Sequence, residues 1–248
     1  MKIVLLCSTG LDAFHQEVLK PVMEDASMGI VGAYIDSRPR PSLKKRFLKN
    51  WKRGRGGYML VMLVKSHLAQ KKPSVSAVEF LCSKGIECVE TQQPYSEESV
   101  AKIKHWSPDV MVLLGGFGII KEPLLSLAPK GILSYHHGDM RKYRGQPVGF
   151  WELYNNESQM GVTVQRLSAG IDKGTPIVER VVPIERGDNV KKLCERAMDS
   201  STSMMHEAIQ LLGDLSFSPN KIQKFGPIYT LPNLRQFLRL QIKLFFRK

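Results

Sequence analysis

Cysteine is scarce in this chain, and Cys7, Cys82, Cys88 and Cys194 show none of the paired short spacings of a zinc site. The opening MKIVLLC is too short for a secretory hydrophobic segment, so we expect free thiols in a reducing cytoplasm. No uncharged apolar run approaches the length of a membrane span. STGLDAF fits neither GxGxxG nor GxxxxGK[ST]. The sequence thus predicts no metal site, no transmembrane segment and no nucleotide cofactor.

Acidic residues are missing from two segments that are rich in cations. Residues 37–72 contain twelve Lys and Arg and no Asp or Glu, and residues 235–248 contain five and no acid. Subtracting these cations from the formal net charge of +13 leaves −4 for the rest of the chain. The positive charge therefore belongs to two appendages, a distribution that does not suggest a generic nucleic-acid-binding core.

Short apolar runs alternate with helical patterns along most of the chain, which predicts an α/β fold with a parallel sheet built from βαβ units. The block at 58–64 fits a helix or a strand equally well. We expect one domain over residues 1–213, with an insertion at about 37–72, and an extension over 214–248. The expected strands are 1–7, 29–36, 86–90, 109–116, 131–136, 161–168 and 175–184, and the expected helices are 13–24, 74–84, 96–105, 122–127 and 189–213.

Titratable side chains gather in SYHHGDMRKYRG, at the carboxyl end of an expected strand, where open parallel sheets bind ligands. Residues two apart on a strand face the same side, so Ser134 and His136 should project together, with His137 on the other side. Asp172, in the turn between two later strands, is an acid that can meet them. These groups fit an acid/base site. By spacing alone, a lone His–Asp pair is more often a structural or solvated contact.

Three segments of the chain resemble the folate-dependent formyltransferase family, which includes methionyl-tRNA formyltransferase, glycinamide ribonucleotide formyltransferase and the sugar N-formyltransferases. They are PDVMVLLGGFGIIKEPLL, GILSYHHGDMRKYRG and GVTVQRLSAGIDKGTPIV. The resemblance covers residues 75–213 well and the first 36 residues less closely. It implies a Rossmann-like, mostly parallel sheet with helices on both faces. The residues that match Asn-x-His-x-Ser-Leu-Leu-Pro-x-Tyr-Arg-Gly and the later Gly-Leu-Asp-x-Gly are His136, Tyr143, Arg144, Gly145, Gly170, Asp172 and Gly174.

The resemblance implies transfer of a formyl group from the co-substrate 10-formyltetrahydrofolate to a primary amine. Amine attack on the formyl carbon creates a tetrahedral oxyanion, which needs donors already aimed at it. His136 would supply one donor, held and kept basic by Asp172, and a proton must also leave the attacking nitrogen.

The resemblance also places the two substrates. Glycine at 116 and 118 would let the pterin approach the backbone, although a simple strand-to-helix turn explains the same glycines. Asp139 and Arg141 would read the acceptor or pair with each other at the surface. The expected folate-binding residues are Gly116, Phe117, Gly118, Ile119, Ile120, Ala169, Gly170 and Ile171, and the expected acceptor-binding residues are His137, Asp139, Tyr143 and Arg144.

One departure from the family pattern concerns the oxyanion donor, because Ser134 stands where the family has asparagine. Losing one such donor typically costs about 10²–10³ in kcat. Three explanations stay open: a slower enzyme that still uses Ser134, another group such as Tyr135 or His137 in the donor's place, or a member that has lost the activity.

The cationic tail has its own pattern. Arg235, Arg239, Lys243 and Arg247 recur at i, i+4 and form a narrow stripe on an otherwise apolar helix, which must bury most of its surface somewhere. We expect the segments 38–72 and 231–248 to lie together at an anionic membrane face or in a protein interface. The alternative is a tail docked on its own core, and a homodimer is left open. Capture of an anionic acceptor such as a nucleotide-sugar fits either arrangement.

Several functions remain to be weighed. Only 35 residues follow Gly213, too few for the tRNA-contacting domain of methionyl-tRNA formyltransferases, so we expect a smaller acceptor, first of all an amino sugar. The His136-His137 doublet suggests a 10-formyltetrahydrofolate hydrolase as the alternative. A catalytically weak protein that binds a membrane or an acidic partner is a third reading. RNA binding is disfavoured, because few aromatics interleave with the cations.

Overall fold

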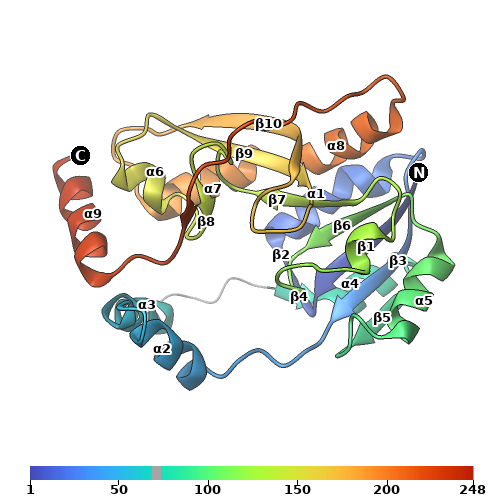
Figure 1. Ribbon diagram of the computed structural model, residues 1–248, viewed down its shortest axis with the longest axis horizontal. Helices are drawn as coiled ribbons and strands as arrows, with labels where there is room; N and C mark the ends of the chain where they lie inside the picture. The colour runs from blue at the N-terminus through green and yellow to red at the C-terminus, as the bar shows by residue number, and fades with distance from the viewer. Residues whose placement is uncertain (69–73, 248) are drawn as a thin grey trace.

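A seven-stranded sheet lies at the centre of the molecule, with strand order β10-β9-β7-β6-β1-β3-β5 (Figure 1). The computed structural model describes residues 1–68 and 74–247. The five strands from β7 to β5 are parallel, whereas β9 runs antiparallel to both β7 and β10. The strands are β1 Lys2–Ser8, β3 Gly29–Asp36, β5 Cys88–Thr91, β6 Val110–Leu114, β7 Ile132–His136, β9 Gln159–Arg166 and β10 Thr175–Pro183.

Helices cover both faces of this sheet, because alternate residues of its central strands are buried on opposite sides. In β1, Ile3 and Leu5 pack into the core beneath α1 and α8, and Val4 and Leu6 pack into a second core beneath α5. The Rossmann-like, mostly parallel fold is therefore confirmed. The covering helices are α1 Ala13–Glu24, α4 Ala77–Cys82, α5 Glu97–Trp106, α7 Val190–Asp199 and α8 Met204–Gly213.

Most of the predicted elements are present, and two predictions were wrong. Residues 74–76, expected to begin a helix, form the strand β4. The single helix expected over 189–213 is two helices, α7 and α8. The hydroxyls of Ser200, Ser201 and Thr202 each donate to the backbone carbonyl three residues earlier, so side chains compete with the helical hydrogen bonds at this point. The ambiguous block at 58–64 lies within a helix, α3 Gly56–Leu68.

Three short elements complete the scaffold around the site. The 3₁₀ helix η1 Leu124–Ser126 follows β6. The strand β2 Gly10–Asp12 pairs with β4 Ser74–Ser76, and β8 Arg144–Gly145 pairs with β11 Ile228–Tyr229. The second pairing attaches the extended chain after α8 to the loop that follows β7, close to the carboxyl edge of the sheet.

Three helices stand at one end of the molecule, away from α5 (Figure 1). These are α2 Leu43–Trp51, α3 and α9 Leu234–Phe246, and α9 contacts both α3 and the short helix α6 Phe150–Tyr154. The Tyr58 and Phe237 rings lie 5.6 Å apart between α3 and α9. The described parts of the two cationic segments thus lie together, as expected, and residues 69–72 and 248 lie outside the described residues. Within the chain, α9 buries only Phe237 and Leu240, so most of its surface is not covered by the protein itself.

Across the part of the chain that the structure describes, no helix combines the length and the apolar character needed to cross a membrane.

Candidate active site

The carboxyl end of β7 and the turn after β9 meet at the same edge of the sheet. Antiparallel pairing places Ser134 opposite Gln165 and His136 opposite Thr163, which brings the β9–β10 turn beside His136. In that turn Asp172 has a φ of 44°, and its Oδ1 lies 3.5 Å from the Nδ1 of His136. The backbone N–H of Gly145 donates to the Oδ2 of Asp172 at 2.7 Å. The structure therefore brings together the predicted imidazole and carboxylate.

The surroundings of His136 favour its protonated form. Its Nε2 lies 2.8 Å from the carbonyl oxygen of Tyr143, and since a carbonyl only accepts, Nε2 carries a hydrogen. A neutral ring would then turn the lone pair of Nδ1 toward the carboxylate of Asp172. Burial opposes the positive charge, but the hydrogen bond and charge of Asp172 outweigh burial and raise the pKa of His136. Burial raises the pKa of Asp172. Its hydrogen bonds and the charge of His136 lower that pKa by more, so the pKa of Asp172 is lowered overall.

Glycine at 138 is required for this placement of His136. A Cβ at Gly138 would lie 2.7 Å from the Nε2 of His136, closer than a real Cβ approaches a neighbouring atom. Gly138 stands where the family motif has serine, and the ring of His136 lies where the Cβ of a serine would come too close.

A cleft of about 700 Å³ opens in front of the His136–Asp172 pair. One wall is the sheet edge, and the opposite wall comes from α2 and from the chain around β11. Ser134, Tyr135 and His137 line the cleft together with the pair. The other residues that line it include Arg46, Lys49, Asn50, Arg53, Arg55, Gly118, Ile119, Ile120, Gln165, Gly170, Ile171, Tyr229 and Thr230.

The predicted folate-binding residues do not all line the same cleft. Those at 118–120 and 170–171 line the cleft in front of His136. Gly116 and Phe117 instead line a second cleft of about 670 Å³, together with residues 8–9 and 36–41. A Cβ at Gly116 would lie 2.9 Å from the backbone nitrogen of Ser8, so this glycine permits a close backbone approach. Ala169 is exposed and lines neither cleft.

His137 lies on the other side of β7 from His136, as strand alternation predicts. Its ring stacks on Tyr135 at 5.5 Å and meets Phe14 edge-on at 5.5 Å. Burial, reinforced by the charges of His136 and His15, lowers the pKa of His137 to about 4. His137 is thus neutral at physiological pH, and its Nε2 has no hydrogen-bond partner among the described residues.

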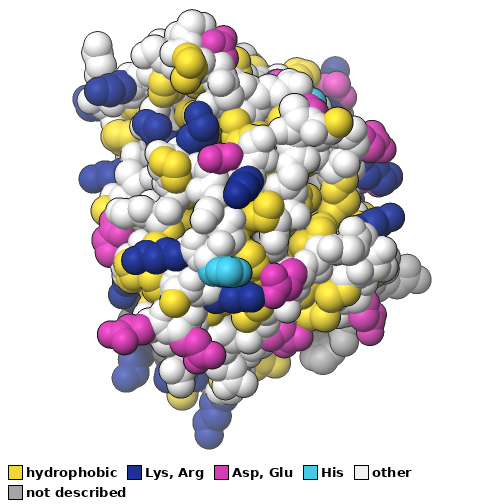
Figure 2. All heavy atoms as spheres, turned by 90° about the vertical axis from the view of Figure 1, so that its right-hand side faces the viewer, with side chains coloured by type: hydrophobic (Ala, Val, Ile, Leu, Met, Phe, Trp, Pro, Cys, Tyr) yellow, Lys and Arg dark blue, Asp and Glu magenta, His cyan; other side chains and the backbone are white. Residues whose placement is uncertain are grey.

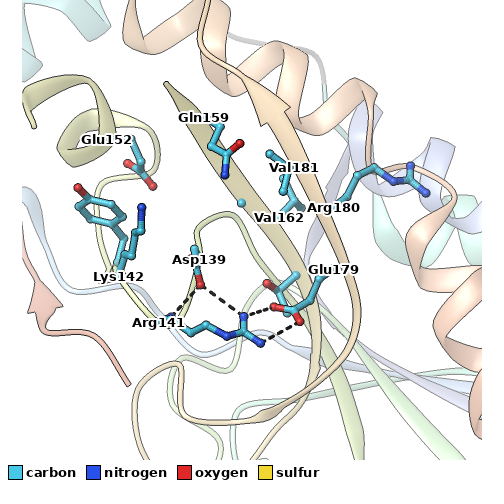
Figure 3. Close-up of a pocket in the computed structure, with 12 residues that line it drawn as sticks. Asp139, Arg141, Lys142, Glu152, Gln159, Val162, Glu179, Arg180 and Val181 are labelled. Carbon is cyan, nitrogen blue, oxygen red and sulfur yellow. Dashed lines mark hydrogen bonds and ion pairs between the residues drawn. The ribbon is translucent and has the colours of Figure 1, made fainter. Parts of the chain in front are cut away.

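The other predicted acceptor-binding residues do not line the cleft. Asp139 lies at a separate cavity of about 250 Å³, where Arg141 points to both Asp139 and Glu179 (Figure 3). Arg141 and Asp139 thus pair with each other, which was one of the two expectations, and Arg141 also pairs with Glu179. Tyr143 donates its hydroxyl hydrogen to Glu157 at 2.9 Å. Arg144 is buried behind His136 and donates to backbone carbonyls at 226 and 171, so it fastens the β11 region to the turn that contains Asp172.

Sequence reasoning missed Glu152, which is 3% exposed on α6. Glu152 lines the small cavity behind His136 and also the cavity shown in Figure 3. Burial raises the pKa of Glu152 to about 7, although the charge of His136 partly opposes this. A single acid in the apolar run FWELY was the available signal, because an acid rarely lies among buried aromatics without a reason.

Gln165 was also missed, and the sequence held no signal for it, because β9 is buried along most of its length. Its Oε1 accepts from the backbone N–H of Gly174 at 2.9 Å. A hydrogen bond from Gln165 helps to lower the pKa of Asp172. This carboxamide thus lies across the strand pair from Ser134, beside the place where the resembling family has asparagine.

No group of three or more His, Cys, Asp and Glu in the described ranges is arranged to bind a metal ion. The four cysteines are free thiols.

Comparison with known proteins identifies the family. A sequence model of the Formyl transferase family matches residues 49–209. The chain belongs to this family. It is 26% identical, over 77% of its own length and 62% of the other protein, to the methionyl-tRNA formyltransferase of Caldanaerobacter subterraneus subsp. tengcongensis. The match thus spans less than two thirds of that relative's length.

Solved structures show the same fold. Glycinamide ribonucleotide transformylase 1 from Symbiobacterium toebii aligns with a TM-score of 0.60 at 17% identity, over 90% of this chain and 94% of that one. An N-formyltransferase from Helicobacter canadensis, solved with folinic acid and dTDP-3-aminofucose, aligns with a TM-score of 0.60 at 14% identity, over 99% of this chain and 81% of that one.

Proposed function

We propose that this formyl transferase moves a formyl group from 10-formyltetrahydrofolate to the primary amine of a small acceptor, and that the acceptor is an amino-sugar nucleotide. One observation supports it above all: the paired His136 and Asp172 face a cleft of about 700 Å³ in a member of the Formyl transferase family. We further propose that residues 1–213 form the catalytic domain, that 214–248 form an extension, and that the protein works in the cytoplasm, where its free thiols stay reduced.

The cleft suits a folate. Ile119 and Ile171 are exposed on the two loops beside the pair and offer apolar surface to a flat ring. Gly118 has open space where a Cβ would be, so a ring can approach the backbone there. Bound 10-formyltetrahydrofolate supplies the activated formyl group, and the protein's residues orient it and stabilise charge.

His136 acts as a preorganised cation. Since Tyr143 holds Nε2, the nitrogen that serves the reaction is Nδ1, on the side of Asp172. The positive ring stabilises negative charge as it develops on the formyl oxygen, in a site where water is largely displaced. Asp172 keeps the ring charged, and its carboxylate is a base within reach of the proton that the attacking amine must lose. Gln165 and the Gly145 N–H hold that carboxylate in place.

We expect an anionic acceptor, because cations of α2 and of the turn that follows it line the cleft. Arg46, Lys49 and Arg53 recur at i, i+3 and i+7 and face the same cleft as His136. In the described part of the chain no carboxylate forms an ion pair with these three cations, so they are available to phosphate groups. The neighbour from Helicobacter canadensis was solved with a nucleotide-linked amino sugar, which has this chemistry.

The test is tetrahydrofolate formation from 10-formyltetrahydrofolate with a panel of amino-sugar nucleotides. We expect acceptor-dependent turnover that falls by about 10²–10⁴ in His136→Ala, the usual contribution of one positioned catalytic group. His105→Ala, which removes an exposed histidine on α5, is the matched control and should keep full activity. Turnover of equal rate without any acceptor would instead show a hydrolase. A folded protein inactive with every acceptor would contradict the proposal.

A further inference from the structure

Exposed large hydrophobic side chains are concentrated on three neighbouring helices. Of seventeen such side chains in the described residues, eleven lie on α2, α3 and α9, and six are scattered over the rest of the surface. Scattered exposed hydrophobics are normal, whereas a concentrated group marks an interaction surface. The eleven are Leu43, Leu48, Trp51, Leu60, Met62, Val64, Leu234, Leu238, Ile242, Phe245 and Phe246.

Helix α9 has two apolar faces and uses only one of them inside the molecule. Phe237 and Leu240 are buried against the neighbouring helices. Leu238, Ile242 and Phe245 follow one another at i, i+4 and i+7 and therefore share a second face, on which they are 49%, 60% and 67% exposed. An isolated helix has no reason to keep so apolar a face in water.

Helix α2 is divided in the same way. Its cations at 46 and 49 line the cleft, as does Arg53 just after the helix, whereas Leu43 and Trp51 do not line it and are 64% and 58% exposed. The ring of Trp51 lies 5.6 Å from that of Phe47. Helix α3 has no charged residue between 56 and 64, and it exposes Leu60 and Val64 one turn apart. All three helices thus expose hydrophobic residues at the same end of the molecule (Figure 1).

The charges around these helices have one sign. Residues 37–68 and 215–247 contain no Asp or Glu, and long cations border the exposed apolar residues, among them Lys44, Lys52, Arg235 and Arg239. The opposite end of the molecule carries acidic and basic side chains intermixed (Figure 2). A second copy docked through the same face would bring like charges together, which disfavours self-association. An apolar surface bordered only by cations matches anionic lipid.

We propose that α2, α3 and α9 form a docking surface for a bilayer that contains anionic lipids. The exposed hydrophobic side chains enter the headgroup boundary, and the bordering Lys and Arg extend to lipid phosphates. This inference goes beyond formyl transfer and does not depend on it, so its test requires no turnover.

The first experiment is sedimentation of the full chain with vesicles. Binding is expected to vesicles of phosphatidylcholine mixed with phosphatidylglycerol, with much weaker binding to phosphatidylcholine alone. The triple variant Leu238→Ser, Ile242→Ser, Phe245→Ser should bind about a hundredfold more weakly or worse, because three large apolar groups no longer leave water. The triple variant Val75→Ser, Val181→Ser, Leu215→Ser removes exposed hydrophobics elsewhere and should bind like the wild type.

A second measurement uses the wild-type protein's own tryptophan as the probe. Trp51 is exposed on α2, whereas Trp106 and Trp151 are buried, so Trp51 reports directly on the docking surface. Brominated anionic lipid should quench part of the tryptophan fluorescence of the wild type and none of that of Trp51→Phe. Equal binding to neutral and anionic vesicles, equal loss in both triple variants, or dimerisation or RNA binding that replaces vesicle binding would overturn the proposal.

Discussion

At the scale of single residues, the site depends on the charge state of His136. A carbonyl fixes one ring nitrogen and Asp172 faces the other, so the pKa of His136 is raised and the ring stays charged as pH rises, until pH passes the raised value. The charge on His136 is therefore a consequence of placement. Removing the negative charge of Asp172 should therefore lower the pKa of His136 and, under the proposed function, narrow the pH range of activity.

Replacing Asp172 with asparagine keeps the shape of the turn and removes its charge. Asp172→Asn should lower kcat by about 10²–10⁴ and move the alkaline limb of the pH–rate profile to lower pH. Kinetics across pH, with the His136 titration followed by NMR, would measure both effects. Asp199→Asn, on the exposed end of α7, is the matched control. An unchanged alkaline limb in Asp172→Asn would show that this carboxylate does not sustain the charge.

The burial of Glu152 leads to a second prediction, which concerns how the free energy of unfolding depends on pH. Its folded pKa of about 7 lies above its ordinary value of 4.5, so its contribution to stability is fully present at acid pH and is lost as pH rises from about 4.5 to 7. Glu152→Gln keeps the shape and cannot ionise. It should be about as stable as the wild type at acid pH and more stable above pH 7, by about 3 kcal/mol.

Urea unfolding at a series of pH values tests this expectation. Glu24→Gln, which removes an exposed carboxyl at the end of α1, should follow the wild type throughout. If the wild type and Glu152→Gln gave parallel stability curves, Glu152 would be ionised in the folded protein and the account of its burial would be wrong.

At the scale of elements, the cations of α2 fall into two groups, those that line the cleft and those that do not. Its residues at 46 and 49 line the cleft together with Arg53 just after it, whereas Lys44, Lys45 and the capping Lys52 do not. Helical spacing alone would also place Lys45 and Lys52 near Lys49, so the division is set by the way this segment packs against the cleft. The cations on the cleft side should therefore affect the acceptor, and those on the other sides should not.

Replacing Arg46, Lys49 and Arg53 together with glutamine should raise the KM for a nucleotide-sugar acceptor by about tenfold or more, since hydrogen bonds to charged groups are the stronger ones. The value of kcat should change little, because none of the three contacts the His136–Asp172 pair. The Lys44, Lys45 and Lys52 triple glutamine variant removes the same charge from the same helix and is the matched control. Equal rises in KM for the two variants would mean that α2 acts only through net charge.

At the scale of the whole molecule, the sheet was predictable, whereas the contacts between distant segments were predictable only in part. Buried strands such as β1 can be recognised in the sequence because they are continuous apolar runs. The break between α7 and α8 cannot, because it depends on hydroxyls that donate to backbone carbonyls of the preceding helix. His136 and Asp172 could be chosen from their place at the end of a strand and in a turn. Glu152, Gln165 and the cations of α2 reach the site only through tertiary packing, which no local pattern encodes.

The end of the molecule formed by α2, α3 and α9 also differs from the sheet in how it is held. Helix α9 is attached through Phe237 and Leu240 and through Lys243, whose Nζ donates to the carbonyl of Tyr154 at 2.6 Å. Its main contacts are with α3 and α6, outside the sheet. A helix with so narrow a buried face should open locally while the sheet stays folded.

Leu240→Ala tests this by removing a fully buried side chain from the docked face. Large-to-small changes of this kind cost about 2–5 kcal/mol, so amide hydrogen exchange in α9 and α3 should accelerate by at least about thirtyfold. Exchange in β1 and β6 should stay at its wild-type rate, because the sheet does not need α9. Leu238→Ala, two residues away on the exposed face, should leave both regions unchanged. Equal acceleration in the sheet and in α9 would show instead that the whole chain unfolds as one cooperative unit.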